Sequence, residues 1–231
     1  MMANNWDYQT RAFKITPIPG VIKVHEFDYK AENAVIYDEN GIVVRTIPAI
    51  HIGDGPVSFI VEYAGMTLVF AGDTTPNKWF VKYVKGADFV IHEAFGNPAQ
   101  YSPLMNQPAQ LSWRMCCEFH TSAQSMGKVM SAIGPRHAVA YHHQEELAPS
   151  IEQSIRTTYS GPLSMARDRM TWNITKDAIT ERMAVVTRRA NAVKGPTPQP
   201  PPEPGRTDPI SARIYAGEWG PGFNAQNEML D

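Results

Sequence analysis

The sequence predicts a mixed α/β domain in which a β-sheet is layered against helices. Two observations lead to this prediction. Strand-like runs joined by turn signals fill the first third of the chain, and strands then alternate with helices after residue 73. The chain has 231 residues, of which 43% are hydrophobic, so it can form one domain with a real core. We expect the domain to cover residues 1–190, and the proline-rich composition of 191–231 predicts a linker and a C-terminal tail.

Runs rich in β-branched residues predict the strands of the first third. Two short turns join neighbouring runs: Asn40-Gly41 is a signal for a two-residue hairpin, and Ala64-Gly65 marks a second one. The predicted strands cover residues 21–29, 34–39, 42–49, 56–63 and 66–73.

After Asp73, helical patterns alternate with apolar runs. Residues 120–134 carry apolar side chains at helical spacing, and Thr121 or Ser122 can cap this helix. The stretch 96–119 is long for a connection, which predicts a lid or a binding loop. The remaining predictions are helices over 77–86 and 150–159, strands over 87–95 and 137–143, and a closing hairpin over 170–175 and 178–186.

Charge and composition exclude several classes of function. The net charge is -2 and the pI is about 6.4, which does not favour a nucleic-acid partner or a polybasic membrane anchor. No apolar run is long enough to cross a bilayer, so we expect no membrane partner. The two cysteines, Cys116 and Cys117, are adjacent, which excludes a disulfide framework and the spaced pairs of a structural zinc site.

Potential metal ligands follow successive apolar strands. A single histidine at a strand end is usually a hydrogen-bonded surface residue, and an aspartate before Thr-Thr-Pro is often a turn residue. The set is more informative than its members, because the ends of neighbouring strands form sites at one rim of a sheet. The set consists of His51 after "RTIPAI", Asp73 after "TLVFAG", His92-Glu93 after "DFVI" and His142-His143 after "AVAY".

The order of these motifs resembles a known family. "PAIH", "VFAGDT", "FVIHEAF", "FHTSAQSMGKV" and "HAVAYHH" together are similar to the C-terminal half of the metallo-β-lactamase superfamily. The nearest branch holds tRNase Z-like and arylsulfatase-like hydrolases. The match covers roughly residues 20–187. It implies an αββα metallo-β-lactamase sandwich, of which this chain supplies only the C-terminal half plus a tail.

The resemblance implies a site for two divalent metal ions, zinc first and manganese or iron as alternatives. His51 would bind the first metal and His142 the second, with His143 as the alternative to His142 because side chains alternate along a strand. Asp73 would bridge both metals. His120 would lie beside them and act as a proton donor or as a stabiliser of negative charge.

The resemblance also assigns supporting residues. His92 and Glu93 would form an outer ring around the ligands. The insertion 96–119 would shape an apolar substrate pocket, and the residues expected to line it are Tyr101, Met105 and Trp113.

The His-x-His-x-Asp-His motif that defines the family does not occur in this sequence. We expect it upstream of residue 1 in a longer gene product. Two alternatives are that a second polypeptide supplies it, or that the lineage has lost its metals. A half-fold exposes a sheet face, so we expect a homodimer or association with a complementary half.

The predicted function is metal-dependent hydrolysis of a small-molecule ester, by water activated between two metals. The candidate substrates are a phosphodiester, a sulfate ester or a lactone, and the truncated chain alone is expected to be weak or inactive. One alternative is a metal-free scaffold or interaction remnant of the fold. The weakest alternative is a tRNA 3′-processing nuclease, because the acidic balance leaves few groups for phosphate contacts.

Overall fold

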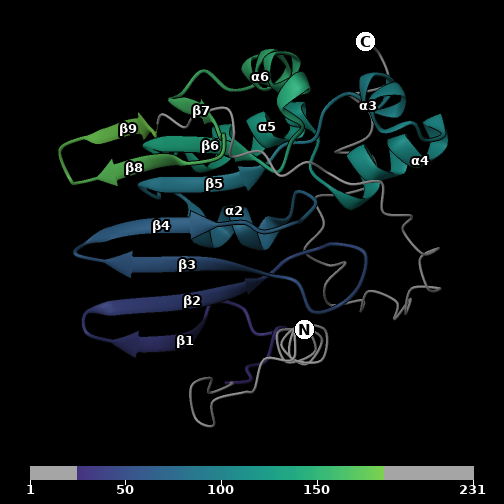
Figure 1. The fold of residues 1–231 in the computed structure, drawn as a ribbon. Coiled ribbons are helices and arrows are strands. Elements are labelled where there is room, and N and C mark those ends of the chain that lie inside the picture. The colour runs from purple at the N-terminus through teal and green to yellow at the C-terminus, as the bar shows by residue number, and fades with distance from the viewer. Residues whose placement is uncertain (1–24, 185–231) are drawn as a thin grey trace, which may run out of the picture.

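The computed structural model describes residues 25–184 of the chain. Within this range the strands of the main sheet follow one another in chain order, from β1 to β7 (Figure 1). The first four strands pair antiparallel, and β4 to β7 pair parallel. The strands are β1 Ala34–Glu39, β2 Ile42–Pro48, β3 Val57–Tyr63, β4 Met66–Phe70, β5 Phe89–Glu93, β6 His137–Tyr141 and β7 Leu163–Met165.

Both predicted hairpin turns are confirmed. Asn40 and Gly41 have φ angles of 55° and 77°, and Ala64 and Gly65 have φ angles of 52° and 72°. Two successive residues with positive φ are what a two-residue hairpin of type I′ requires. The strands therefore pair without a gap on either side of each turn.

Helices pack on one face of the sheet. The core between the two layers includes Val69, Val90 and Ala138, which lie in register on neighbouring strands, and Met126 and Met130 of the facing helix. The helices that contribute to this core are α2 Lys78–Val84, α5 Ala123–Ile133 and α6 Ala148–Arg156.

Helix α5 begins where the sequence predicted. Ser122 is its N-cap, and the Ser122 hydroxyl accepts a hydrogen bond from the N–H of Ser125 at 3.3 Å. The helix ends at Gly134, whose φ of 61° is the left-handed conformation that terminates many helices. Local sequence signals thus determine both ends of the helix that follows His120.

The opposite face of the sheet is apolar and partly exposed. Phe59 lies opposite Phe70 in the ladder, and these side chains are 36% and 43% exposed. A separate hairpin of β8 Met170–Ile174 and β9 Ile179–Met183 packs on the same face, where Trp172 lies 5.6 Å from Phe89. One sheet with helices on one face and apolar residues on the other is half of an αββα sandwich, as predicted.

The insertion between β5 and α5 is helical. Its first two helices lie together beyond the sheet (Figure 1). A small apolar cluster formed by Phe95, Tyr101 and the two buried cysteines fills its interior. Its elements are α3 Pro98–Met105, α4 Ala109–Trp113 and the π-helical turn η1 Arg114–Phe119.

One further strand prediction is wrong, and one strand was missed. The strand predicted over 21–29 is wrong in its described part, because residues 25–29 form no strand and Ala31 N–H closes a turn on the Asp28 carbonyl at 3.1 Å. Strand β7 was not predicted. The proline-rich tail, 191–231, lies outside the described residues. Within residues 25–184, no helix is both long and apolar enough to cross a bilayer.

Candidate metal centre

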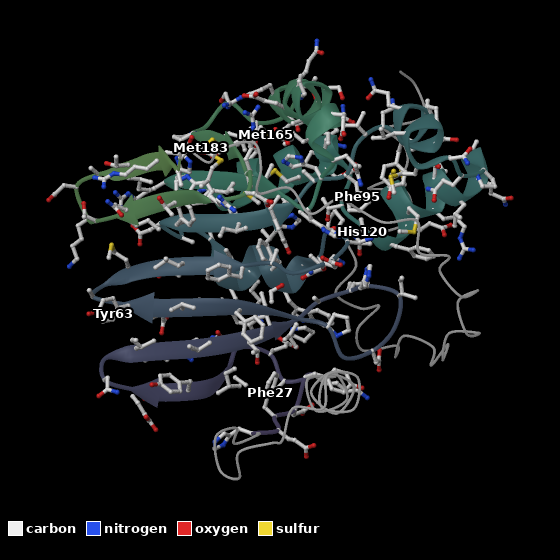
Figure 2. All side chains as sticks on the ribbon, viewed as in Figure 1. Phe27, Tyr63, Phe95, His120, Met165 and Met183 are labelled. Carbon is white, nitrogen blue, oxygen red and sulfur yellow. The ribbon has the colours of Figure 1, made fainter. Side chains whose placement is uncertain are left out.

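The parallel strands bring the predicted ligands to one rim of the sheet. Glu93 is the last residue of β5, His142 follows the last residue of β6, and Asp73 follows β4 after a short turn. Because the C-terminal ends of parallel strands meet at the same edge, these side chains converge. Figure 2 shows His120 close to the same strand ends. Asp73, Glu93, His120 and His142 each offer a ligand atom, and these atoms lie within 4.8 Å of one another.

Asp73 lies between two imidazoles. Its Oδ2 atom is 3.5 Å from Nε2 of His142 and 4.0 Å from Nε2 of His51. Two atoms that bind one zinc at ~2.0–2.1 Å with tetrahedral geometry lie roughly 3.4 Å apart, so this spacing fits a metal between them. The three side chains are 18% to 43% exposed, which leaves the site open to a substrate.

A backbone hydrogen bond fixes the tautomer of His51. Its Nδ1 lies 2.6 Å from the carbonyl oxygen of Phe119, to which the Nδ1–H donates. The lone pair is therefore on Nε2, the atom that faces Asp73. Burial lowers the pKa of His51 and of His142, which favours the neutral form of both rings, the form in which an imidazole can coordinate a metal.

The structure places His142, and not His143, beside Asp73. Strand β6 ends at Tyr141, and His142 then adopts a left-handed conformation with φ of 59°. This turn directs the His142 ring toward Asp73, whereas Nδ1 of His143 lies 3.3 Å from the carbonyl of Gln144. A left-handed conformation is uncommon for a residue other than glycine, and such residues cluster at functional sites.

Glu93 contacts the His120 ring directly. Its Oε2 atom is 2.6 Å from Nδ1 of His120, and its Oε1 accepts the N–H groups of Thr74 at 2.7 Å and Thr121 at 3.2 Å. The carboxyl group is 0% exposed, and burial raises its pKa well above the ordinary value. Burial also lowers the pKa of His120 to about 4. The sequence placed Glu93 in the outer ring but gave no sign of this pairing.

Phe95 is a site residue that the sequence analysis missed. Its ring stacks on the His120 ring with centroids 3.9 Å apart and planes 10° apart, and Figure 2 shows the two side by side. The His120 ring is also 4.7 Å from His51 and 5.3 Å from His142. The "HEAF" motif contains Phe95, and its place after a strand end was the only available signal.

The other predicted site residues contact the core or the insertion, or are exposed on its surface. His92 points to the helix side of β5, where it meets Phe80 edge-on at 5.1 Å. Tyr101 is 5% exposed and packs against Phe95, and Trp113 packs on the same cluster. Met105 ends α3 and is 45% exposed. Tyr101 therefore supports the interior of the insertion.

Comparison with known proteins found sequence relatives that are named ribonuclease Z. No family model matches the chain. Ribonuclease Z of Mycobacterium tuberculosis (strain ATCC 25618 / H37Rv) is 28% identical over 158 residues, which cover 66% of this chain and 54% of that protein. Ribonuclease Z of Mycobacterium sp. (strain KMS) is 29% identical over 139 residues, covering 60% of this chain and 46% of the relative. The chain thus spans about half the length of these curated relatives.

Solved structures of low sequence identity were also found. The metallo-β-lactamase fold protein YhfI from Bacillus subtilis is 13% identical, with a TM-score of 0.47 over 66% of this chain and 53% of that one. The short form of human tRNase Z is 19% identical, with a TM-score of 0.40 over 59% of this chain and 44% of that one. In its sequence, the chain is similar to the ribonuclease Z proteins of the metallo-β-lactamase superfamily, and the resemblance expected from its motifs is confirmed.

Proposed function

We propose that the protein is a metal-dependent hydrolase that cleaves phosphodiester bonds. The observation that carries this proposal is the convergence of His51 and His142 on Asp73, with His120 beside them. Neutral imidazole nitrogens and a carboxylate are suitable ligands for zinc, manganese or iron. His51, Asp73 and His142 would hold the two metal ions, which would supply Lewis-acid activation of water and of the scissile group.

The protein's own contribution is to hold and orient His120. Glu93 fixes Nδ1, and Phe95 stacks on one face of the ring, so Nε2 is left to act on a substrate. When the Glu93 carboxyl group is protonated and donates to Nδ1, Nε2 carries the hydrogen and can donate a hydrogen bond to a leaving oxygen or to a developing negative charge. Burial favours the neutral ring, as the lowered pKa of His120 indicates.

The name of the curated relatives favours a particular phosphodiester. Both relatives are named ribonuclease Z, so an RNA phosphodiester now ranks above the sulfate esters and lactones considered from the sequence. The structure offers one supporting feature. Arg167 and Arg169 follow β7 at the same rim as the metal centre, and the Ala166 N–H bonds to the Ala140 carbonyl of β6 at 2.7 Å. Arginines are suited to contact a phosphate backbone.

Zinc titration and a substrate panel test the proposal. We expect calorimetry to show tight binding of about two ions per chain, lost on Asp73→Ala. The zinc-loaded protein should hydrolyse bis(4-nitrophenyl) phosphate and an RNA oligonucleotide faster than 4-nitrophenyl sulfate or a lactone. Arg182→Gln, on strand β9, is the matched control for a surface change. Faster cleavage of the sulfate or lactone would contradict the phosphodiester assignment.

A metal-free scaffold is the second candidate. The observation that favours it is the absence of the His-x-His-x-Asp-His motif from the 231 residues. The same titration separates the two candidates. Binding only in the millimolar range, unchanged by Asp73→Ala, would support the scaffold and exclude the enzyme for this chain.

A further inference from the structure

Hydrogen bonds join three of the loops that carry side chains of the candidate metal centre. One loop follows β2, one follows β4, and one precedes α5. Loops that carry ligands must be held in place before a metal arrives, because ordering them on binding would reduce the affinity. The hydrogen bonds between these loops therefore show how the site is prepared.

Thr74 is the residue at which the three loops meet. Its N–H donates to Oε1 of Glu93 at 2.7 Å, and its carbonyl accepts from the Thr121 hydroxyl at 2.5 Å. Its own hydroxyl oxygen accepts from the N–H of Ile50 at 3.1 Å. Thr74 is 0% exposed, so water does not compete for these bonds.

Each hydrogen bond from Thr74 to one of the other two loops involves a residue next to a candidate site residue. A second bond between the same two loops runs from the Thr75 N–H to the Ile50 carbonyl at 2.7 Å. The backbone next to three of the site residues is thereby fixed by hydrogen bonds within the protein. The neighbouring pairs are Ile50 and His51, Thr74 and Asp73, and Thr121 and His120.

The Thr74 hydroxyl has its hydrogen-bonding capacity filled. Besides the N–H of Ile50, it accepts from Nδ2 of Asn77 at 3.2 Å, and it donates to the carbonyl of Thr75 at 2.8 Å. A valine at this position keeps the shape of threonine but leaves the buried Ile50 N–H without its acceptor. Serine keeps the hydroxyl and removes only a methyl group.

We propose that Thr74 is a positioning residue whose hydroxyl joins the His51 loop to the Asp73 loop and so preorganises the metal centre. The inference rests on the proposed metal-dependent function. An ordinary turn residue bonds within its own loop. The Thr74 hydroxyl instead bonds to Ile50, which is 24 positions away in the chain. Thr74 touches neither metal nor substrate in this role.

The test compares three single variants. Thr74→Val should weaken zinc binding by about 10- to 100-fold in a competition titration, as expected for loss of a group that orients a ligand. Thr74→Ser should bind within about threefold of the wild type, since it keeps the acceptor. Thr75→Val is the matched control: Thr75 is 5% exposed, and within residues 25–184 its hydroxyl has no hydrogen-bond partner. Zinc binding by Thr74→Val within twofold of the wild type, or equal losses in Thr74→Ser and Thr74→Val, would overturn the proposal.

Amide hydrogen exchange in the metal-free protein gives a second measurement. The wild-type Ile50 N–H should exchange slowly, and Thr74→Val should accelerate its exchange while leaving the distant amides of β6 unchanged. Fast exchange of Ile50 in the wild type would overturn the proposal even if Thr74→Val does not fold. A wild type that binds no zinc contradicts the proposed function instead, and the Ile50 exchange then decides the role of Thr74 separately.

Discussion

Glu93 Oε2 lies 2.6 Å from Nδ1 of His120, although the two residues are 27 positions apart in the sequence. Both side chains are almost fully buried, at 0% and 5% exposure. A buried carboxyl group that also accepts two backbone N–H groups cannot move without losing several bonds. The pair therefore fixes the direction in which the His120 ring presents its Nε2.

This pairing predicts the effect of Glu93→Gln. The amide can donate to Nδ1 of His120 but cannot exchange a proton with it, whereas a carboxyl group can carry or release one. We expect hydrolysis of bis(4-nitrophenyl) phosphate by the zinc-loaded protein to fall by about 10- to 100-fold, with zinc stoichiometry unchanged. Glu62→Gln, which removes an exposed ion pair with Arg45, is the control and should retain full activity. Wild-type turnover by Glu93→Gln would show that His120 does not depend on Glu93.

Because the backbone of His142 is left-handed, a substitution there should affect stability and metal binding differently. Asparagine adopts this conformation more readily than other residues, so His142→Asn should leave the unfolding midpoint of the metal-free protein unchanged or raised. Zinc affinity should fall at least about 10-fold because a ligand is removed. Thermal unfolding in chelator and calorimetric titration measure the two effects. His143→Asn is the control and should keep wild-type affinity; equal losses in both variants would argue against His142 as the ligand.

Acid should destabilise the fold through His92. Burial lowers the pKa of His92 to about 4 from the ordinary value of 6.5, so the unfolded chain takes up this proton first as the pH falls. Stability is therefore lost between pH 6.5 and about 4, by about 3 kcal/mol for this group. His92→Asn keeps a donor for the Glu93 carbonyl, which His92 Nδ1 contacts at 2.8 Å, and removes the titration.

Urea unfolding in chelator at pH 7.5 and pH 4.5 measures this effect. The difference in unfolding free energy between the two pH values should be smaller in His92→Asn than in the wild type. Val90→Ala, a core change on the same strand, should lower stability equally at both pH values. An unchanged difference in His92→Asn would assign the acid sensitivity to other groups.

The exposed sheet face predicts self-association. Phe59 and Phe70 lie opposite each other and are 36% and 43% exposed, so a second copy could cover them. Phe70→Glu should weaken a dimer by about 10- to 100-fold, which corresponds to losing the burial of one large apolar side chain. Sedimentation velocity over a concentration series measures the change. Phe27→Glu, at an aromatic residue that is 41% exposed outside the strands, is the control. A wild type that stays monomeric would contradict the prediction.

Local signals in the sequence predicted much of the fold. The Asn40-Gly41 turn and the Ser122 cap act over two to four residues, so each could be recognised without the rest of the chain. The insertion was harder to interpret because α3 contains Pro103 and has little amphipathic pattern, which favours a loop when it is judged locally. Strand β7 has only three residues, too few for a pattern.

The site was predicted in part for a related reason. Ligands at strand ends can be recognised because each follows an apolar run, as Asp73 and His142 do. The contacts that organise the site join residues far apart in the chain, such as Glu93 with His120 and Thr74 with Ile50. Residue type and spacing do not specify which of many polar residues pair at that range, and only the folded chain reveals them.

The π-helical turn Arg114–Phe119 connects the insertion directly to the candidate metal centre. Its last carbonyl, on Phe119, accepts the Nδ1–H of His51. This hydrogen bond links the helices of the insertion to the candidate metal ligand. Lengthening the chain near Asn106, between α3 and α4, would leave this hydrogen bond intact. Adding or removing a residue inside the turn would rotate the carbonyl away and release the imidazole. Insertions and deletions in related sequences should therefore be confined to the part of the insertion that contains α3 and α4.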